Sequence, residues 1–318
     1  MNSPDPTQSA ALRRILIDNV EQTVPRAARM RHRRVRTPLL TGLIAIPVAA
    51  AIAITAVVTW PATDSATAAE ALRDAADVTI TTSDPFVGPG QYLKVTTEAA
   101  YLAYEHDADD QLNAYLAPST REVFIPADPG QDWVRRLTAQ PATAFYGEAS
   151  HAAAQRDWKE TVRGGVVRVV RAADGGFEQA DELGGEIADV PLPETPEQTL
   201  TFLHELPYGD GTDDGALAYA AQLLRDGTMP ASQRSVLYRA LALLPGIRIT
   251  DGNAVLDGRT GIAFSLDADP GTREIIVDPT TGLFIGERTL SAAAIGAVPA
   301  GTEQSYTAVS TTVVDTAP

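Results

Sequence analysis

The chain has 318 residues, no cysteine and a formal net charge of −16, from 41 acidic and 25 basic residues. The absence of cysteine excludes disulfides, thiolate nucleophiles and zinc–thiolate sites. The charge is divided unevenly: residues 1–37 carry eight basic and three acidic side chains, whereas residues 61–318 carry 17 and 38, a net charge of −21. An acidic part of this size, without a basic groove, argues against a nucleic-acid partner.

Residues 1–37 form a basic arm that begins with a turn-rich segment. Helical spacing places four apolar residues on one face and predicts one short amphipathic helix: Leu12, Ile15, Leu16 and Val20. We interpret this helix as lying on the membrane surface, and the alternative is a docking helix for a cytoplasmic partner. Attraction to anionic lipids of the inner leaflet accounts for the charge of the arm.

An uncharged run of 22 residues extends from Leu39 to Trp60. As an α-helix it would be about 33 Å long, enough to cross a hydrocarbon core of about 30 Å, with Trp60 at the interface. We therefore predict a transmembrane helix over residues 38–60. Six arginines precede it: Arg26, Arg29, Arg31, Arg33, Arg34 and Arg36.

This arginine cluster sets the expected topology. Because basic residues stay on the cytoplasmic side, we expect a single-pass protein of the cell membrane with residues 1–37 inside and an extracytoplasmic domain over 61–318. A cleavable signal peptide is the alternative, since Ala66-Thr67-Ala68 resembles a cleavage site. The apolar run, however, exceeds the ~7–15 residues usual for a signal core.

The first part of the outer domain is predicted to be rich in strands. After a helix over 67–77 and a Gly-Pro turn cluster, the apolar residues alternate with period two, which indicates an antiparallel meander. Gly164-Gly165 is predicted to connect a further strand pair, and the acidic, glycine-rich residues 173–190 to form a mobile loop. The expected strands are 91–105, 111–117, 120–126, 158–163 and 166–172, with a helical turn at 131–137.

The middle of the domain is predicted to be helical. Thr195, Pro196 and Gln198 form a start signal, with threonine at the N-cap, proline at the first helical position and glutamine completing a capping box. This helix should run to about residue 206. A second is expected over 215–227 and a third between Pro230 and Pro245. In the third helix, three leucines at helical spacing should face the sheet: Leu237, Leu241 and Leu244.

The last seventy residues return to strands, predicted at 247–250, 261–267, 273–278, 283–290 and 303–315. Between two of them, Asp278 should form an Asx-type turn and Gly282 should adopt a positive φ, as in a hairpin loop that ends on a left-handed glycine. Strands, then helices, then strands, without βαβ alternation, predict an α+β fold with a mostly antiparallel sheet and helices inserted between two strand blocks.

Sequence motifs for chemistry are lacking. The chain has no nucleophile elbow, zinc-protease helix, phosphate-binding loop or dinucleotide fingerprint. The loop with Asp210, Asp213 and Asp214 only loosely resembles a calcium site, because the EF-hand spacing is not met. We therefore assign no catalytic residue, no cofactor and no metal ligand.

Three segments together resemble a known family: 229–250 (MPASQRSVLYRALALLPGIRIT), 258–266 (GRTGIAFSL) and 273–288 (REIIVDPTTGLFIGER). They are similar to the C-terminal half of a largely uncharacterised family of actinobacterial single-pass membrane proteins. Its members often accompany extracytoplasmic-function sigma factors and are described as anti-sigma-factor-like. The resemblance implies a curved, half-barrel-like sheet, similar to lipoprotein-carrier and RseB-like sensor domains. The 37-residue arm has no cysteine, so it cannot form a zinc-type anti-sigma domain.

We expect a non-enzymatic, membrane-tethered extracytoplasmic sensor or regulatory protein, with membrane lipids and an envelope or regulatory protein as partners. The alternative is a membrane-anchored lipid or lipopeptide carrier with a small apolar ligand, and a third reading is a hydrolase with an unrecognised site. A carrier pocket would lie between the sheet and the helices of 195–244. Alternating strand residues are candidates for its floor or for the core: Tyr92, Val95, Ile262, Phe264 and Ile276.

Overall fold

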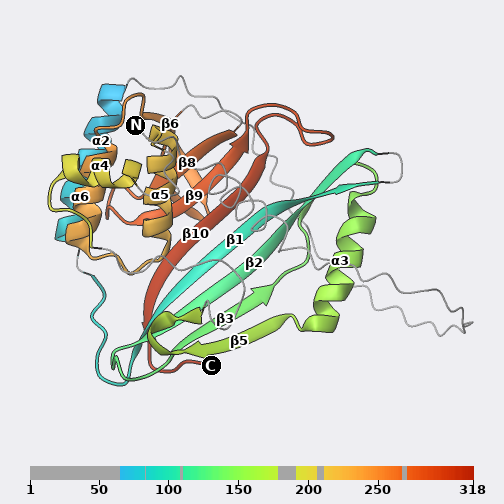
Figure 1. Ribbon diagram of the computed structural model, residues 1–318, viewed down its shortest axis with the longest axis horizontal. Coiled ribbons are helices and arrows are strands. Elements are labelled where there is room, and N and C mark those ends of the chain that lie inside the picture. The colour runs from blue at the N-terminus through green and yellow to red at the C-terminus, as the bar shows by residue number, and fades with distance from the viewer. Residues whose placement is uncertain (1–64, 83, 108–109, 178–190, 206–210, 267–270) are drawn as a thin grey trace, which may run out of the picture.

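A computed structural model describes residues 65–318, except 83, 108–109, 178–190, 206–210 and 267–270 (Figure 1). The arm of 1–37 and the predicted transmembrane helix of 38–60, with Leu39, Trp60 and the six arginines, lie outside the described residues. Most of the predicted loop of 173–190 does so too. Within the described part of the chain, no helix is long and apolar enough to cross a membrane.

A large, open antiparallel sheet is the centre of the fold and confirms the predicted α+β class. Its order is β5-β3-β2-β1-β10-β9-β8-β7-β6, and β4 pairs with β2. The last strand therefore joins the two strand blocks, with Val95 opposite Thr311. The strands are β1 (Tyr92–His106), β2 (Leu112–Pro126), β3 (Trp133–Ala139), β4 (Ala144–Tyr146), β5 (Val167–Ala172), β6 (Arg248–Leu256), β7 (Arg259–Ser265), β8 (Gly271–Val277), β9 (Phe284–Ser291) and β10 (Glu303–Val314).

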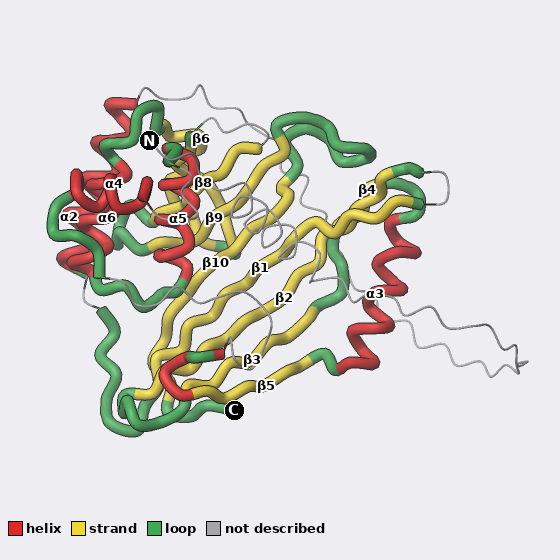
Figure 2. Tube along the Cα trace, in the orientation of Figure 1, coloured by secondary structure: helices red, strands yellow, loops and turns green. Residues whose placement is uncertain are grey.

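The helices gather at the two ends of the sheet, as Figure 2 shows. Four of them, α2, α4, α5 and α6, form a layer at one end, and α3 lies alone at the other. In β1, Val95 belongs to the core under the four helices, and Ala103, eight residues further along the same strand, packs on the α3 side. Because residues an even number apart share a face, both helical groups cover the same face of the sheet. The bounds are α2 (Ser65–Thr81), α3 (Ser150–Gly164), α4 (Pro196–Glu205), α5 (Asp213–Arg225) and α6 (Ala231–Leu241).

The main core lies between the four helices and the sheet. Its fully buried side chains come from both layers and include Leu72, Leu203, Leu217, Leu237, Leu241, Phe264 and Ile275. Leu244 is also buried, but it lies three residues beyond the end of α6. Helix α6 packs chiefly against α2 and α4, so Leu237 and Leu241 enter the core from within the helical layer. A smaller cluster on the opposite face contains Ala263, Ile276, Ile285 and Ala308.

The predicted signals at Thr195 and Gly282 start helix α4 and close the β8–β9 hairpin. Thr195 Oγ1 accepts a hydrogen bond from Gln198 N at 3.3 Å, as a capping residue does. Thr212 caps α5 through Gly215 N at 3.0 Å, so this helix begins two residues before its predicted start. In the β8–β9 hairpin, Asp278 O accepts from Gly282 N at 2.8 Å, and Gly282 has a φ of +65°.

Two predicted elements are wrong in type. Residues 158–163, predicted as a strand, belong to helix α3. Ala153 and Ala154 in the first half of this helix pack against Tyr115, and the helix continues through the alternating stretch. Residues 131–137, predicted as a helical turn, overlap strand β3, which begins at Trp133. Its two adjacent arginines point to opposite faces: Arg135 lies over the Phe177 ring at 4.6 Å, and Arg136 pairs with Glu122.

The strands predicted at 111–117 and 120–126 are one continuous strand, β2, with Pro118 inside it. Pro118 O accepts a hydrogen bond from Gln140 N at 3.1 Å, so the side that lacks an N–H faces β3 and β4. This position falls between the stretch of β2 paired with β4 and the stretch paired with β3. Proline is tolerated there because no ladder hydrogen bond is lost.

Candidate functional site

The five residues proposed for a pocket or the core lie on two different faces. Val95 and Phe264 are buried beneath the helical layer, with Ile262 half-buried beside them. Ile276 is opposite Ala263 in the β7–β8 register, so it lies in the cluster on the other face. Tyr92 is half-buried, an odd number of residues from Val95 along β1, and thus also turned away from the helices.

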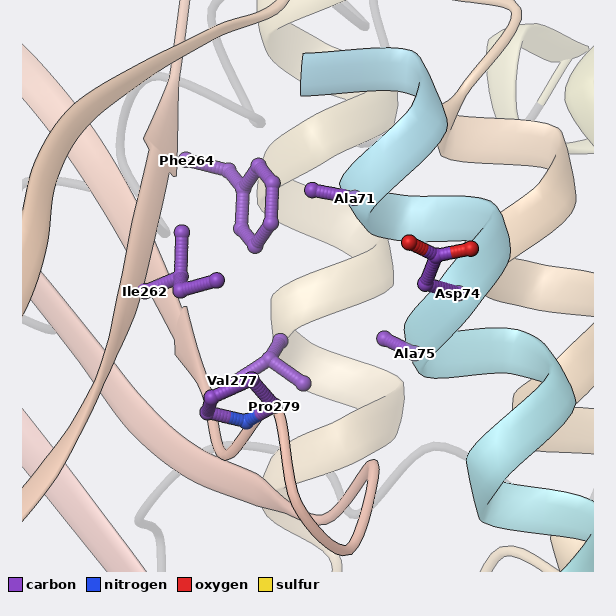
Figure 3. Close-up of a pocket in the computed structure, with 7 residues that line it drawn as sticks. All are labelled: Ala71, Asp74, Ala75, Ile262, Phe264, Val277 and Pro279. Carbon is purple, nitrogen blue, oxygen red and sulfur yellow. The ribbon is translucent and has the colours of Figure 1, made fainter. Parts of the chain in front are cut away.

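A small pocket lies where α2 crosses β7 and β8. Its volume is about 150 Å³, and it brings together two of the proposed residues, Ile262 and Phe264. Figure 3 shows these side chains and Val277 facing α2, with Asp74 as the charged group at the pocket. The remaining lining residues are Ala71, Ala75 and Pro279. Ligand pockets usually measure ~300–1,000 Å³, so this one holds at most a small apolar group.

A second hollow lies along α4. It measures about 370 Å³ and is a shallow depression on the surface. Phe202 supplies an aromatic ring, and two glutamates give it a negative character. Its lining residues are Pro193, Glu197, Gln198, Thr201, Phe202 and Glu205. A shallow polar rim around one aromatic side chain is a feature of protein-binding surfaces rather than of enclosed ligand sites.

A buried ion-pair cluster connects the helical layer to the sheet. Glu287 of β9 has a side chain only 6% exposed and pairs with Arg225 of α5 and, at 2.7 Å, with Arg273 of β8. Burial opposes ionisation of Glu287, but the two guanidinium groups outweigh it and lower its pKa. Sequence reasoning missed this cluster. The sequence offered no distinctive signal, because Glu287 lies in a strand that also contains Arg288 and Thr289.

Two histidines of the outer domain, His151 and His204, have structural partners. The His204 ring lies 3.0 Å from an Asp213 carboxylate oxygen and links α4 to the first turn of α5. The His151 ring stacks on Phe145 with centroids 3.7 Å apart. Among the described residues, no group of three His, Cys, Asp or Glu side chains could hold a metal ion.

The geometry defines an α+β module: an open antiparallel sheet with helices closing both ends of one face. No family model matches the chain, and no curated protein matches it. Among solved structures, this chain is similar to one in the MucA/MucB complex of Pseudomonas aeruginosa. The alignment covers 79% of this chain and 58% of the other chain, at 11% identity and a TM-score of 0.25.

A DUF1329 family protein from Desulfovibrio piger aligns with 79% of this chain and 93% of its own, at 10% identity and a TM-score of 0.20. The chain thus spans little more than half the length of the first of these two structures. At such scores neither likeness carries an argument about function.

Proposed function

We propose that this chain is a non-enzymatic, membrane-tethered extracytoplasmic regulatory module that recognises a protein partner. The observation that carries the proposal is the filling of the space between sheet and helices. Leu217, Leu241 and Phe264 occupy the volume in which a carrier would hold its ligand, and about 150 Å³ remains at the α2 crossing. A module that binds at its surface needs no such cavity.

The expected anchor supports a role close to the membrane. Ser65, the first residue of α2, follows Trp60 by five residues. An extended chain spans at most ~3.6 Å per residue, so the helical layer would lie within about 18 Å of the end of the anchor. The resemblance of residues 229–288 to proteins that accompany extracytoplasmic-function sigma factors supports a link to envelope signalling.

A lipid carrier is the second candidate, and the α2 pocket favours it. Ala71 lies six residues into α2, which is about 9 Å of helix from Ser65. The end of one acyl chain could therefore enter from the membrane side, where each buried methylene contributes ~0.8 kcal/mol.

Lipid extraction and native mass spectrometry of the purified full-length chain separate the two candidates. The regulatory proposal expects no stoichiometric lipid, whereas a carrier retains about one lipid per chain. Ala71→Trp would fill the pocket, and Glu70→Trp, at the neighbouring exposed position of the same helix, is the matched control. Lipid that is present in the control and lost in Ala71→Trp would establish the carrier.

Photo-crosslinking in living cells tests the protein partner directly. A photoreactive amino acid is placed at exposed positions of two surfaces, Thr201 on α4 and Val169 on β5. Protein recognition predicts a discrete protein adduct from at least one of them. Adducts with lipid alone would overturn the proposal.

A further inference from the structure

Helix α4 carries a half-buried aromatic ring in the middle of its polar, solvent-facing side. Thr199 and Leu203 are fully buried and hold the inner side of the helix against the core. On the outer side, every fourth residue from Glu197 to Glu205 lies along one row, and Phe202 lies in the row beside it. Together they line the shallow depression of about 370 Å³. The depression thus presents one ring between two carboxylates.

These two carboxylates have no counter-charge. Glu197 and Glu205 are exposed, and among the described residues neither side chain has an ion-pair or hydrogen-bond partner. The neighbouring His204 is already held by Asp213 at 3.0 Å. Residues 172–224, which include the whole of α4, contain twelve acidic residues and no lysine or arginine. A cationic group at the depression would therefore meet no competing cation from this stretch of the chain.

Helix stability explains Glu197 but not Glu205. Glu197 lies in the first turn of α4, where the positive end of the helix dipole favours a carboxylate. Glu205 is the last residue of the helix, where the negative end of the dipole opposes a carboxylate by about 0.3–1 kcal/mol. No basic side chain in the described part of the chain pairs with Glu205 to offset this cost. An uncompensated local cost of this kind is typical of functional residues.

We propose that the outer side of α4 is the docking site for a basic segment of the partner protein. This inference rests on the proposed protein-recognition function and names its site and the chemistry of its partner. Phe202 precedes Glu205 by three residues, about 4.5 Å along the helix, so one arginine of the partner can lie over the ring and pair with Glu205. Glu197 is about 12 Å from Glu205 along the helix and takes a second basic side chain. In an extended segment this spacing corresponds to residues four apart, ~13 Å.

Spacing and charge disfavour other occupants of the depression. Two carboxylates about 12 Å apart along a helix cannot share one metal ion, whose oxygen ligands lie at ~2.0–2.6 Å. Anionic lipids and nucleic acids would meet the acidic stretch of 172–224. A second copy of this chain would bring an outer part with a net charge of −21, and long-range repulsion opposes its approach.

Glu205→Lys separates docking from a structural role, because the two roles predict opposite effects. A lysine at the last residue of α4 complements the helix dipole, so the variant should keep or raise the Tm, whereas it should repel a basic segment. Glu70→Lys makes the same charge change at an exposed position of α2 and is the matched control. Phe202→Leu keeps an apolar side chain in the depression and removes the ring.

The experiment measures fluorescence anisotropy of labelled peptides with the full-length chain in mild detergent at low salt. Three peptides of about nine residues are compared: one with two arginines four residues apart, one with the same arginines adjacent, and one with glutamates in their place. We expect the spaced peptide to bind about threefold more tightly than the adjacent isomer and at least about tenfold more tightly than the glutamate peptide. Glu205→Lys should weaken it about tenfold, Phe202→Leu about two- to fivefold, and Glu70→Lys less than about twofold.

Three results would overturn the docking site: equal binding of all three peptides, or of none; equal losses in Glu205→Lys and Glu70→Lys; or self-association of the wild type that Glu205→Lys abolishes in sedimentation. If Phe202→Leu unfolds, Glu205→Lys and its control decide alone. Failure here, with a protein adduct from Val169, would remove the α4 site and leave the proposed function standing. Adducts with lipid alone from both crosslinking positions would instead remove the function itself.

Discussion

Gly282 of the β8–β9 hairpin lies directly against Thr79 of α2. A Cβ atom at Gly282 would lie 2.7 Å from Thr79 Cβ and 2.5 Å from the carbonyl oxygen of Ala75. The glycine thus serves two purposes, since its φ of +65° closes the turn and its missing side chain lets the hairpin pack on the helix. The sequence motif indicated the first purpose, and only the packing reveals the second.

Replacement of this glycine separates the two purposes. Gly258 has a similar φ of +72° but nothing within 4 Å of a Cβ atom, so Gly258→Ala should cost only the left-handed strain, about 1 kcal/mol. Gly282→Ala should cost about 1–3 kcal/mol more, because the helix backbone must move. Urea unfolding measures both, and equal losses would show that the hairpin does not press on α2.

The leucines of α6 offer a test of the main core. Leu241 is fully buried, whereas Leu243, two residues further along, is 40% exposed. Leu241→Ala should lower the free energy of unfolding by about 2–5 kcal/mol, and Leu243→Ala by less than about 0.5 kcal/mol. A loss below about 0.5 kcal/mol for Leu241→Ala would mean that this face of α6 is available to a partner.

The buried ion-pair cluster should matter more than a surface pair of the same type. Glu287→Gln leaves Arg225 and Arg273 without their carboxylate and should destabilise the fold by about 3 kcal/mol. Glu105 pairs with Arg156 at the surface, with both side chains more than 40% exposed, so Glu105→Gln should cost less than about 0.5 kcal/mol. Chemical denaturation that gave equal losses would contradict a structural role for the cluster.

The lowered pKa of Glu287 predicts a pH dependence of defined sign. A carboxylate whose pKa is lower in the folded state stabilises the protein above its unfolded value, near 4.5, and this contribution is lost as the pH falls through the folded pKa. Wild-type stability should therefore fall more steeply below pH 4.5 than that of Glu287→Gln. Parallel curves in thermal unfolding from neutral to acidic pH would refute the assignment.

The topology can be tested with reporter fusions. Alkaline phosphatase, which is active only outside the cytoplasm, should be active when fused after residue 318 and inactive when fused within residues 1–37, because the six arginines hold the arm inside. A soluble, released protein that begins near Ala69 would contradict the anchor and favour the signal-peptide alternative.

Local chemistry explains what sequence reasoning could predict. The capping of α4 by Thr195 and the turn from Asp278 to Gly282 depend on residues within four positions of each other, and they form as expected. The alternating periodicity likewise indicated most strands and the α+β class, because it reflects one buried face whatever the partner strand is. For the pocket beside α2, the sequence alone placed Ile262 and Phe264 among the candidates for a pocket or core. It did not show which face of the sheet they occupy.

Long-range pairing decided the rest. The place of β10 beside β1, the helix at 150–164, and the separation of Ile276 from Phe264 each depend on segments far apart in the chain. The place of β5 at the end of the strand order belongs here as well: the expected strand at 158–163 would have given β5 a hairpin partner, but these residues lie in α3, whose Ala153 and Ala154 pack on Tyr115. Periodicity reports how each segment is buried, whereas only the packed tertiary structure determines which surfaces bury it and which edges stay exposed.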